Sequence, residues 1–254
     1  MIYGGDGGVS RIDPVNASNV YVEYVHGALA KSTDGGETFA NAVNGITESS
    51  ANFMFIAPYV FDPNDSLRLY TGGAQLWRTE NGMGSWTAAS APIPQVSGAV
   101  DSVTAIAVSP VNPNLVVFGS HYGKIFRSAS TLFADGTTVW PFSQPRLGNV
   151  SYLEFDPENP NTVYATYATF NSVPTDQHVY RSTDAGITSV SYTHLDVYKR
   201  QVKVHGRSGH LYFRVLLSLA RSAREMPLSM PGNFGRPWRE VGAVCVLHGG
   251  VFAQ

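Results

Sequence analysis

Hydrophobic positions between residues 9 and 189 fall into short runs, and none of the runs has the spacing of an amphipathic helix. The runs are rich in valine, isoleucine, tyrosine and phenylalanine, and glycine, proline, asparagine or aspartate separates them. Such runs favour β-strands, and the separating residues favour tight turns. The pattern therefore predicts an all-β fold. The expected strands are residues 19–24, 27–31, 51–56, 67–73, 75–78, 103–108, 115–119, 124–127, 150–155, 162–166 and 178–181.

A turn marker recurs along this region at a nearly constant spacing. It reads Asp-Pro three times and Ser-Pro once, with the prolines at Pro14, Pro63, Pro110 and Pro157. Successive prolines are 49, 47 and 47 residues apart. A fixed period of this length indicates a repeat architecture with one supersecondary unit per period. Four-strand units of this length are typical of β-propellers, so we expect about four consecutive four-stranded blades forming an open arc.

A second marker follows each turn and is clearest in the sequence Ser-Thr-Asp-Gly-Gly-Glu-Thr-Phe, which begins at Ser32. The oxygen atoms of Ser32 and Asp34 can bond backbone amides within their own turn. Gly36 permits the positive φ angle that a tight reversal needs. Thr38 and Phe39 then begin a new strand, with the ring directed beneath the turn. The segment is therefore predicted to be a hairpin that holds itself together.

Three further segments repeat this pattern with changes. One matches it closely, one has asparagine in place of the aspartate, and one is longer than the others. We call the segment that begins at Ser32 and these three segments box turns, numbered one to four in chain order. The corresponding residues are Asn81 and Trp86 in residues 79–86, Asp135 and Gly136 in residues 128–140, and Ser182, Asp184 and Gly186 in residues 181–188.

The pattern Ser-x-Asp-x-Gly-x-Thr-aromatic resembles the Asp-box of the BNR repeat, found in sialidases, sortilin-type receptors and xyloglucan-cleaving glycoside hydrolases. The resemblance covers residues 1–189 and includes Gly-Gly-Asp-Gly-Gly near the start, as in a secreted bacterial subgroup. In that family the box joins the last two strands of a blade, on the face away from the active site. The resemblance thus implies structural box turns and a secreted or cell-surface location, although this sequence carries no signal peptide.

The antiparallel order of a blade places the box turns and the turn markers on one face, which we call the box face. The opposite face, which we call the loop face, holds the loops between second and third strands and the links between blades. Loops on a rigid scaffold commonly carry function. The strands expected to be innermost begin near Val9, Phe53, Val103 and Tyr152.

The loop face supplies the candidate site residues. Asp6 stands between two pairs of glycines, which allow a ligand to approach closely. Together with Asp101 it is a candidate pair of catalytic carboxylates for a glycosidase, and an aspartate that bonds its own turn is the alternative. The loop histidines are either ligand-binding residues or simply exposed polar residues. The candidate ligand-binding residues are His26, His121, Tyr122 and Asp176.

The repeat stops within the fourth box turn, where Ser189 replaces the expected tryptophan or phenylalanine. Residues 190–201 resemble the translation of a sequencing-library transposase adapter joined to its own reverse complement, which indicates a chimeric junction. Residues 1–189 hold 8 basic and 16 acidic residues, whereas residues 202–254 hold 7 and 2. We expect propeller blades over residues 1–189, an adapter-derived scar over 190–201, and an unrelated or out-of-frame tail over 202–254. A basic membrane-surface or nucleic-acid-binding helix in the tail is the alternative.

Composition narrows the chemistry further. The acidic repeat region predicts no nucleic-acid partner, and no apolar run reaches the length of a membrane span. Motifs for nucleotide or zinc binding are absent, and the only cysteine is Cys245. We therefore expect no metal and no cofactor.

The function predicted from these features is that of a binding or scaffolding module of a secreted bacterial protein, with a carbohydrate or protein ligand. The acidic, cysteine-free repeats and the lack of an assembled catalytic group favour this function. The alternative is a fragment of a sialidase-like or xyloglucanase-like glycoside hydrolase, in which a missing blade supplies the other catalytic carboxylate. A second inward carboxylate opposite Asp6 in the longer protein would favour the hydrolase.

Overall fold

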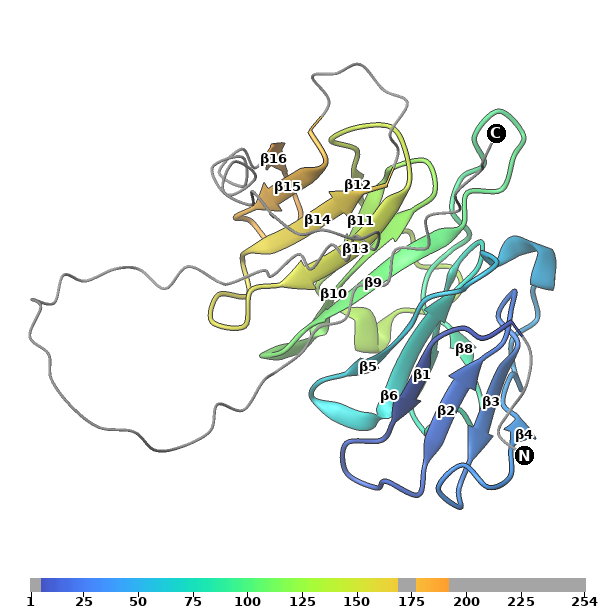
Figure 1. Cartoon of the computed structure of the whole chain (residues 1–254). Helices are drawn as coiled ribbons and strands as arrows, with labels where there is room; N and C mark the ends of the chain where they lie inside the picture. Colours follow the sequence, from blue (N-terminus) through green and yellow to red (C-terminus); the bar gives the residue numbers. More distant parts are fainter. Residues whose placement is uncertain (1–5, 169–176, 192–254) are drawn as a thin grey trace, which may run out of the picture. The chain divides into compact units, whose positions relative to one another are not determined.

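Each predicted blade is a four-stranded antiparallel sheet in the computed structural model, which describes residues 6–168 and 177–191 (Figure 1). In every sheet the strands pair in chain order. The all-β prediction is confirmed over these residues, where the only helical elements are two single 3-10 turns. The elements are β1 (Ser10–Ile12), β2 (Val20–Glu23), β3 (Leu29–Ser32), β4 (Ala40–Asn41), η1 (Ser50–Asn52), β5 (Tyr59–Asp62), β6 (Asp65–Gly72), β7 (Leu76–Thr79), β8 (Thr87–Ala88), β9 (Val103–Ser109), β10 (Asn112–Ser120), β11 (Ile125–Ser128), η2 (Thr131–Phe133), β12 (Phe142–Ser143), β13 (Val150–Phe155), β14 (Val163–Tyr167), β15 (Val179–Ser182) and β16 (Val190–Ser191).

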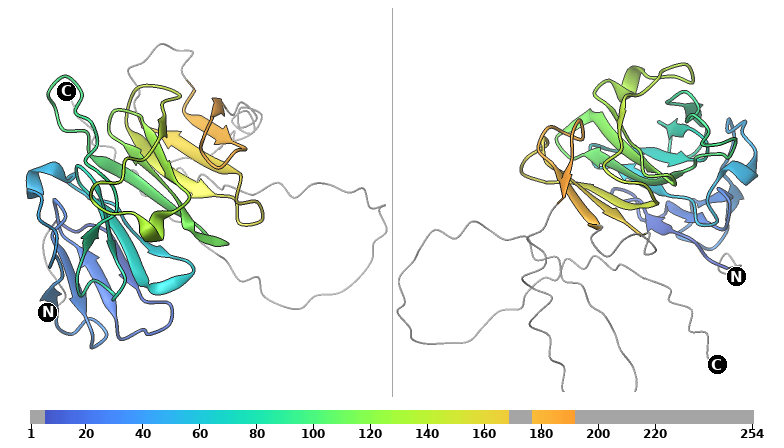
Figure 2. Two further views of the ribbon diagram at one scale, coloured as in Figure 1. Left: turned by 180° about the vertical axis from the view of Figure 1, so that it is seen from behind. Right: turned by 90° about the horizontal axis from the view of Figure 1, so that it is seen from above.

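Consecutive sheets pack face to face, and Figure 2 shows them following one another in chain order. A separate hydrophobic cluster fills each junction. Trp86 belongs to the cluster between the first and second sheets, Phe118 to the next, and Leu153 to the last. The first strands β5 and β13 both contact β9, whereas the fourth strands mainly contact their own third strands. These are the packing relations of propeller blades, whose first strands lie innermost.

The expected strand over residues 51–56 is wrong. Residues 50–52 form the 3-10 turn η1, capped by the Ser49 side chain, and the first strand of the second blade begins at Tyr59. The apolar run was misleading because its residues do not share one environment. Phe53 is buried beneath Gly27, where any side chain would meet the phenylalanine ring, whereas Phe55 is 52% exposed. The segment is therefore a loop that inserts one side chain, that of Phe53, into the core.

The predicted common face of the turn markers and box turns is confirmed. The turn markers join first to second strands, and the box turns join third to fourth strands. In an antiparallel sheet these two connections lie at the same end. In three blades a backbone hydrogen bond joins the box turn to the turn before the second strand or to the beginning of that strand: Gly35 to Ser18 (2.9 Å), Gly82 to Leu67 (2.8 Å) and Ala185 to Asn161 (2.7 Å).

Candidate functional site

Box turn one is closed by its own side chains, as predicted. The Ser32 hydroxyl donates to the Asp34 carboxylate at 2.6 Å and accepts the Gly36 amide at 2.8 Å. The other bonds of Asp34 come from the amide and the hydroxyl of Thr38, at 2.9 and 2.5 Å. The Ser32 and Thr38 hydroxyls hold the pKa of the Asp34 carboxyl far below its usual range. The hydrogen bonds of the Asp34 carboxylate come from its own turn, so its role is to stabilise that turn.

The fourth box turn repeats the same bonds. Ser182 donates to Asp184 at 2.7 Å and accepts the Gly186 amide at 2.8 Å, and the amide and hydroxyl of Thr188 donate to Asp184 at 2.8 and 2.5 Å. Burial acts to raise the pKa of Asp184, but the hydroxyls of Thr188 and Ser182 outweigh it and lower the value to about 2.

Box turn two keeps this geometry without an aspartate. The amide oxygen of Asn81 accepts the Thr79 hydroxyl and the Ser85 amide, each at 2.9 Å, while its nitrogen donates to the Ser85 hydroxyl at 3.0 Å. Asparagine can replace aspartate here because Ser85, at the position of Thr38 and Thr188, accepts a hydrogen bond where those threonines donate one. In box turn three the turn η2 intervenes, and Asp135 instead bonds Thr137 and Thr138.

The aromatic residues of the box turns join neighbouring blades. The indole nitrogen of Trp86 donates to the Ala42 carbonyl at 2.8 Å, and that of Trp140 donates to the Ala89 carbonyl at 3.0 Å. Ala42 and Ala89 each follow directly after the fourth strand of the preceding blade. Both tryptophans are almost completely buried, whereas Phe39 in the first box turn is half-buried.

Substituting Ser189→Trp is expected to increase the free energy of unfolding by about 1–2 kcal/mol, because an indole ring packed against the third blade buries additional apolar area. Position 189 is equivalent to Trp86 and Trp140, and Gln144 follows β12 as Ala42 follows β4. The new indole would therefore reach the Gln144 carbonyl. Urea denaturation measures the effect with Ser189→Ala as the control, and equal stability of the two variants would contradict the equivalence.

On the loop face, hydrogen bonds connect the candidate loops of the first three blades. The His26 amide donates to the Phe55 carbonyl at 3.0 Å, and the Ser102 hydroxyl donates to the Asn52 carbonyl at 2.6 Å. The His121 amide then donates to the Ser102 carbonyl at 2.9 Å. The loop that carries His26 and the loop that carries His121 are thus each anchored to a link between blades.

Two exposed pairs of rings mark matching loops of the first and third blades. The His26 ring meets the Phe55 ring edge to face at 5.5 Å and 90°. The His121 ring meets the Tyr122 ring at 5.1 Å and 80°. His26, Phe55 and His121 are exposed, and Tyr122 is half-buried. The remaining ligand-binding candidate, Asp176, lies outside the described residues.

Asp101 is completely buried and forms an ion pair with Lys124, whose ammonium lies 3.1 Å from its carboxylate. The Ser120 hydroxyl donates to the same carboxylate oxygen at 3.0 Å, and the Tyr122 amide donates to the other at 3.1 Å. Lys124 also donates to the Pro94 carbonyl at 3.1 Å. These bonds fix the loop that presents Tyr122, and every oxygen of Asp101 has a partner.

Asp6 is exposed at the start of the first blade, so the structure gives the two proposed catalytic carboxylates opposite environments. A third carboxylate, Glu23, was missed in the sequence. It is 2% exposed, and one oxygen accepts the Ala57 amide at 3.2 Å, while the other is buried without a hydrogen bond in the part of the chain described. Burial raises the pKa of Glu23, although the bond from Ala57 acts in the opposite direction.

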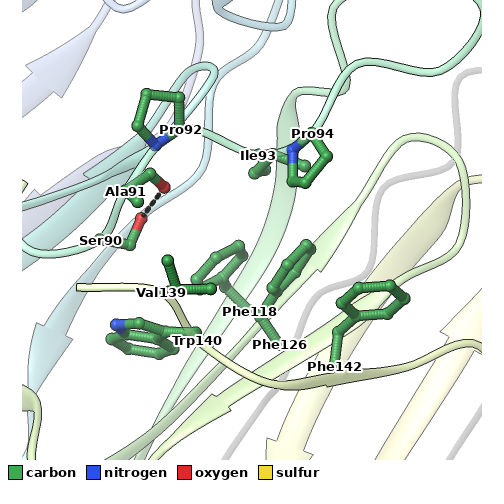
Figure 3. A pocket seen from close by; sticks show the side chains of 10 residues that line it. All are labelled: Ser90, Ala91, Pro92, Ile93, Pro94, Phe118, Phe126, Val139, Trp140 and Phe142. Atoms are coloured by element: carbon green, nitrogen blue, oxygen red, sulfur yellow. Dashed lines mark hydrogen bonds between the residues drawn. The ribbon is translucent and has the colours of Figure 1, made fainter. Parts of the chain in front are cut away.

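A pocket lies between the second and third blades (Figure 3). Eight of its ten lining residues are apolar or proline side chains without a polar group, and the polar two are engaged elsewhere. The Ser90 hydroxyl donates to the Ala91 carbonyl and accepts the Leu76 amide, each at 3.0 Å, and Trp140 bonds Ala89. Ligand pockets normally present a few free polar groups that orient the ligand. This pocket presents none and is a packing gap at the junction.

Within residues 6–168 and 177–191, no three His, Cys, Asp or Glu side chains are grouped as a metal site would require. The same residues contain no helix long and apolar enough to cross a membrane.

No family model matches the chain, and a search of curated proteins also gave no match. Solved structures are similar to the chain, and two GH74 proteins are among them. An ancestral GH74 enzyme has a TM-score of 0.50 and 22% identity, over 73% of this chain and 24% of its own. The GH74 xyloglucanase from Xanthomonas campestris has a TM-score of 0.55 and 17% identity, over 76% of this chain and 31% of its own. The chain thus spans between a quarter and a third of these proteins. At these identities the likeness shows the fold alone, which is that of β-propeller blades.

Proposed function

We propose that the chain is part of a secreted bacterial β-propeller of the BNR type that binds a carbohydrate or protein ligand on its loop face. The observation that carries this proposal is the pair of exposed ring contacts, His26 with Phe55 and His121 with Tyr122. Aromatic side chains on anchored loops provide contact area with little loss of conformational freedom on binding. On the box face, the side chains of box turns one, two and four instead bond one another within each turn.

The buried ion pair also favours binding over catalysis. A glycosidase needs one protonated and one ionised carboxyl group that both reach the substrate. Asp101 is completely buried and its oxygens are occupied, so we assign it to positioning Tyr122 rather than to acid–base chemistry. Asp6 keeps access to solvent but has no assigned partner for catalysis in this part of the chain.

A hydrolase remains the second candidate because of Glu23. A buried carboxyl group with a raised pKa and one unbonded oxygen is the type of group that acts as a general acid. It lies against Gly8, two residues from Asp6, where any side chain would overlap its carboxylate. The likeness to GH74 enzymes is compatible with this function but does not establish it, because one fold supports many activities.

Binding and hydrolysis can be separated with xyloglucan oligosaccharides and a glycan array. We expect saturable binding of a glycan by the full chain, without release of reducing sugar. Substituting Tyr122→Ala should weaken that binding on the order of tenfold, as for a central contact residue. Release of reducing sugar that Asp6→Asn or Glu23→Gln abolishes would instead establish the hydrolase, and glycan binding unaffected by Tyr122→Ala would exclude this part of the loop face.

A further inference from the structure

A basic residue stands at the same position of the third strand in every blade, directly before the serine or threonine whose hydroxyl opens the box turn. The four residues are Lys31, Arg78, Arg127 and Arg181. Strand register places each of them beside one central residue of the second strand: Tyr21, Tyr70, Val117 and Tyr164, in chain order.

In the first three blades this basic side chain reaches into the box turn of the next blade. The Lys31 ammonium donates to the Gly82 carbonyl in box turn two at 2.9 Å. Arg78 donates through one guanidinium nitrogen to the carbonyls of Thr131 and Ala134 in box turn three, the latter at 3.3 Å.

The third junction repeats the contact. The Arg127 guanidinium donates to the Ala185 carbonyl in box turn four at 3.0 Å. Although the three box turns differ in length and sequence, each receives a hydrogen bond from the blade before it. This hydrogen bond therefore joins consecutive blades at all three junctions described.

Arg181 is the exception. Its Nε donor is buried and has neither a hydrogen-bond partner nor an ion pair in the part of the chain that the structure describes, whereas the Nε of Arg78, which also lacks a hydrogen bond, lies 3.1 Å from the Glu80 carboxylate. Buried donors are almost always paired in native proteins, because leaving one unpaired forfeits its bonds to water. The surrounding face is also less covered. Tyr21, Tyr70 and Val117 are each 0% exposed beneath the following blade, whereas Tyr164 is only half-buried.

On the basis of the proposed β-propeller, we propose that this face of the fourth blade, made by Tyr164 and Arg181, is the docking surface for a further blade of the same repeat. The Arg181 guanidinium donates to a backbone carbonyl in the box turn of that blade. The occupant belongs to the same polypeptide in the longer protein. Each link between blades starts where a fourth strand ends, so a repeat that follows β16 is delivered to this face. The similar GH74 structures are three to four times as long as the part matched here, which leaves room for it.

The test supplies the missing blade from the chain itself. A copy of residues 144–191 is inserted after Ser191 of the full chain, because these residues form one repeat from the end of β12 to the end of β16. The copy of Ala185 then offers Arg181 the carbonyl that Ala185 offers Arg127. Arg181→Met and Arg127→Met are compared in the original and the extended chains by thermal unfolding.

We expect Arg181→Met to leave the Tm of the original chain unchanged and to lower that of the extended chain by about 3–6 °C. Arg127→Met is the matched control, since its partner is present in both, and it should lower the Tm of both chains. An equal effect of Arg181→Met in the two chains would overturn the proposal.

Hydrogen exchange gives a second readout that needs no substitution. Amides of β14 and β15 should exchange at least about tenfold more slowly in the extended chain, because covering a face suppresses local opening. Unchanged exchange, or an inserted repeat that remains unfolded while the first four blades fold, would overturn the proposal. Concentration-dependent oligomers of the original chain that Arg181→Met dissociates would identify a second copy as the occupant and refute the assignment to the same polypeptide.

Discussion

Substituting Trp86→Ala should lower the free energy of unfolding by about 3–5 kcal/mol, the range observed when a large aromatic side chain is removed from a core. Trp86 is 3% exposed in the cluster that joins the first and second blades, and its indole donates to the Ala42 carbonyl across the junction. The substitution removes both the buried indole ring and its hydrogen bond to the Ala42 carbonyl. Urea denaturation of the full chain measures the loss.

Trp86→Phe is the matched control, because it keeps most of the ring and removes the donor. It should destabilise the protein by about 1–2 kcal/mol, from one lost hydrogen bond and a smaller ring. A loss below about 1 kcal/mol for Trp86→Ala would contradict the role of the box aromatic as the element that holds consecutive blades together.

The second large effect is expected at the buried ion pair of the loop face. Substituting Asp101→Ala should destabilise the protein by about 3–5 kcal/mol, because it leaves the buried Lys124 ammonium without its counter-charge. It also removes the acceptor of the Tyr122 amide, so the loop loses its anchor. Chemical denaturation checks the prediction at neutral pH.

The double substitution Asp101→Leu with Lys124→Met provides the control. Replacing both charges by apolar groups of similar size often leaves stability unchanged, so the double variant should recover most of the loss. If Asp101→Ala is as stable as the original chain, Asp101 has no structural role and must be reconsidered as a catalytic group.

The sequence predicted the architecture because two signals agreed. The constant spacing of the prolines located the blades, and the box turns located the connection between third and fourth strands. Both signals are local, since a box turn forms its bonds within a few residues, as Ser32 and Asp34 show. Local chemistry of this kind is readable without knowledge of the rest of the chain.

Contacts between residues far apart in the sequence were harder to predict. The run around Phe53 was taken for a strand because hydrophobicity alone does not distinguish a strand from a loop that inserts one ring into a core. The partner of Asp101 lies 23 positions away, and nothing in the sequence singles out Lys124. Glu23 did leave a signal, since it is an acidic residue in an otherwise apolar strand.

In the fourth blade, too, some features were predicted from the sequence and others were not. Its first strand is Val150–Phe155, as expected, and Val150 pairs with Tyr167 across a bulge. Its fourth strand is Val190–Ser191, the first two residues of the segment expected to be an adapter-derived scar. Residues 192–254, which include the rest of that segment and the expected tail, lie outside the described residues, so their non-native origin remains a prediction from the sequence.

The central claim is that the box face maintains the fold and the loop face binds the ligand. It is tested most directly by measuring both Tm and xyloglucan-oligosaccharide affinity for Asp34→Ala and Tyr122→Ala. The account predicts that Asp34→Ala lowers the Tm and leaves Kd within about twofold, because it breaks only the bonds of box turn one. Tyr122→Ala should raise Kd on the order of tenfold with little change in Tm. An Asp34→Ala variant with an unchanged Tm and lost binding would show that the functions of the two faces are reversed.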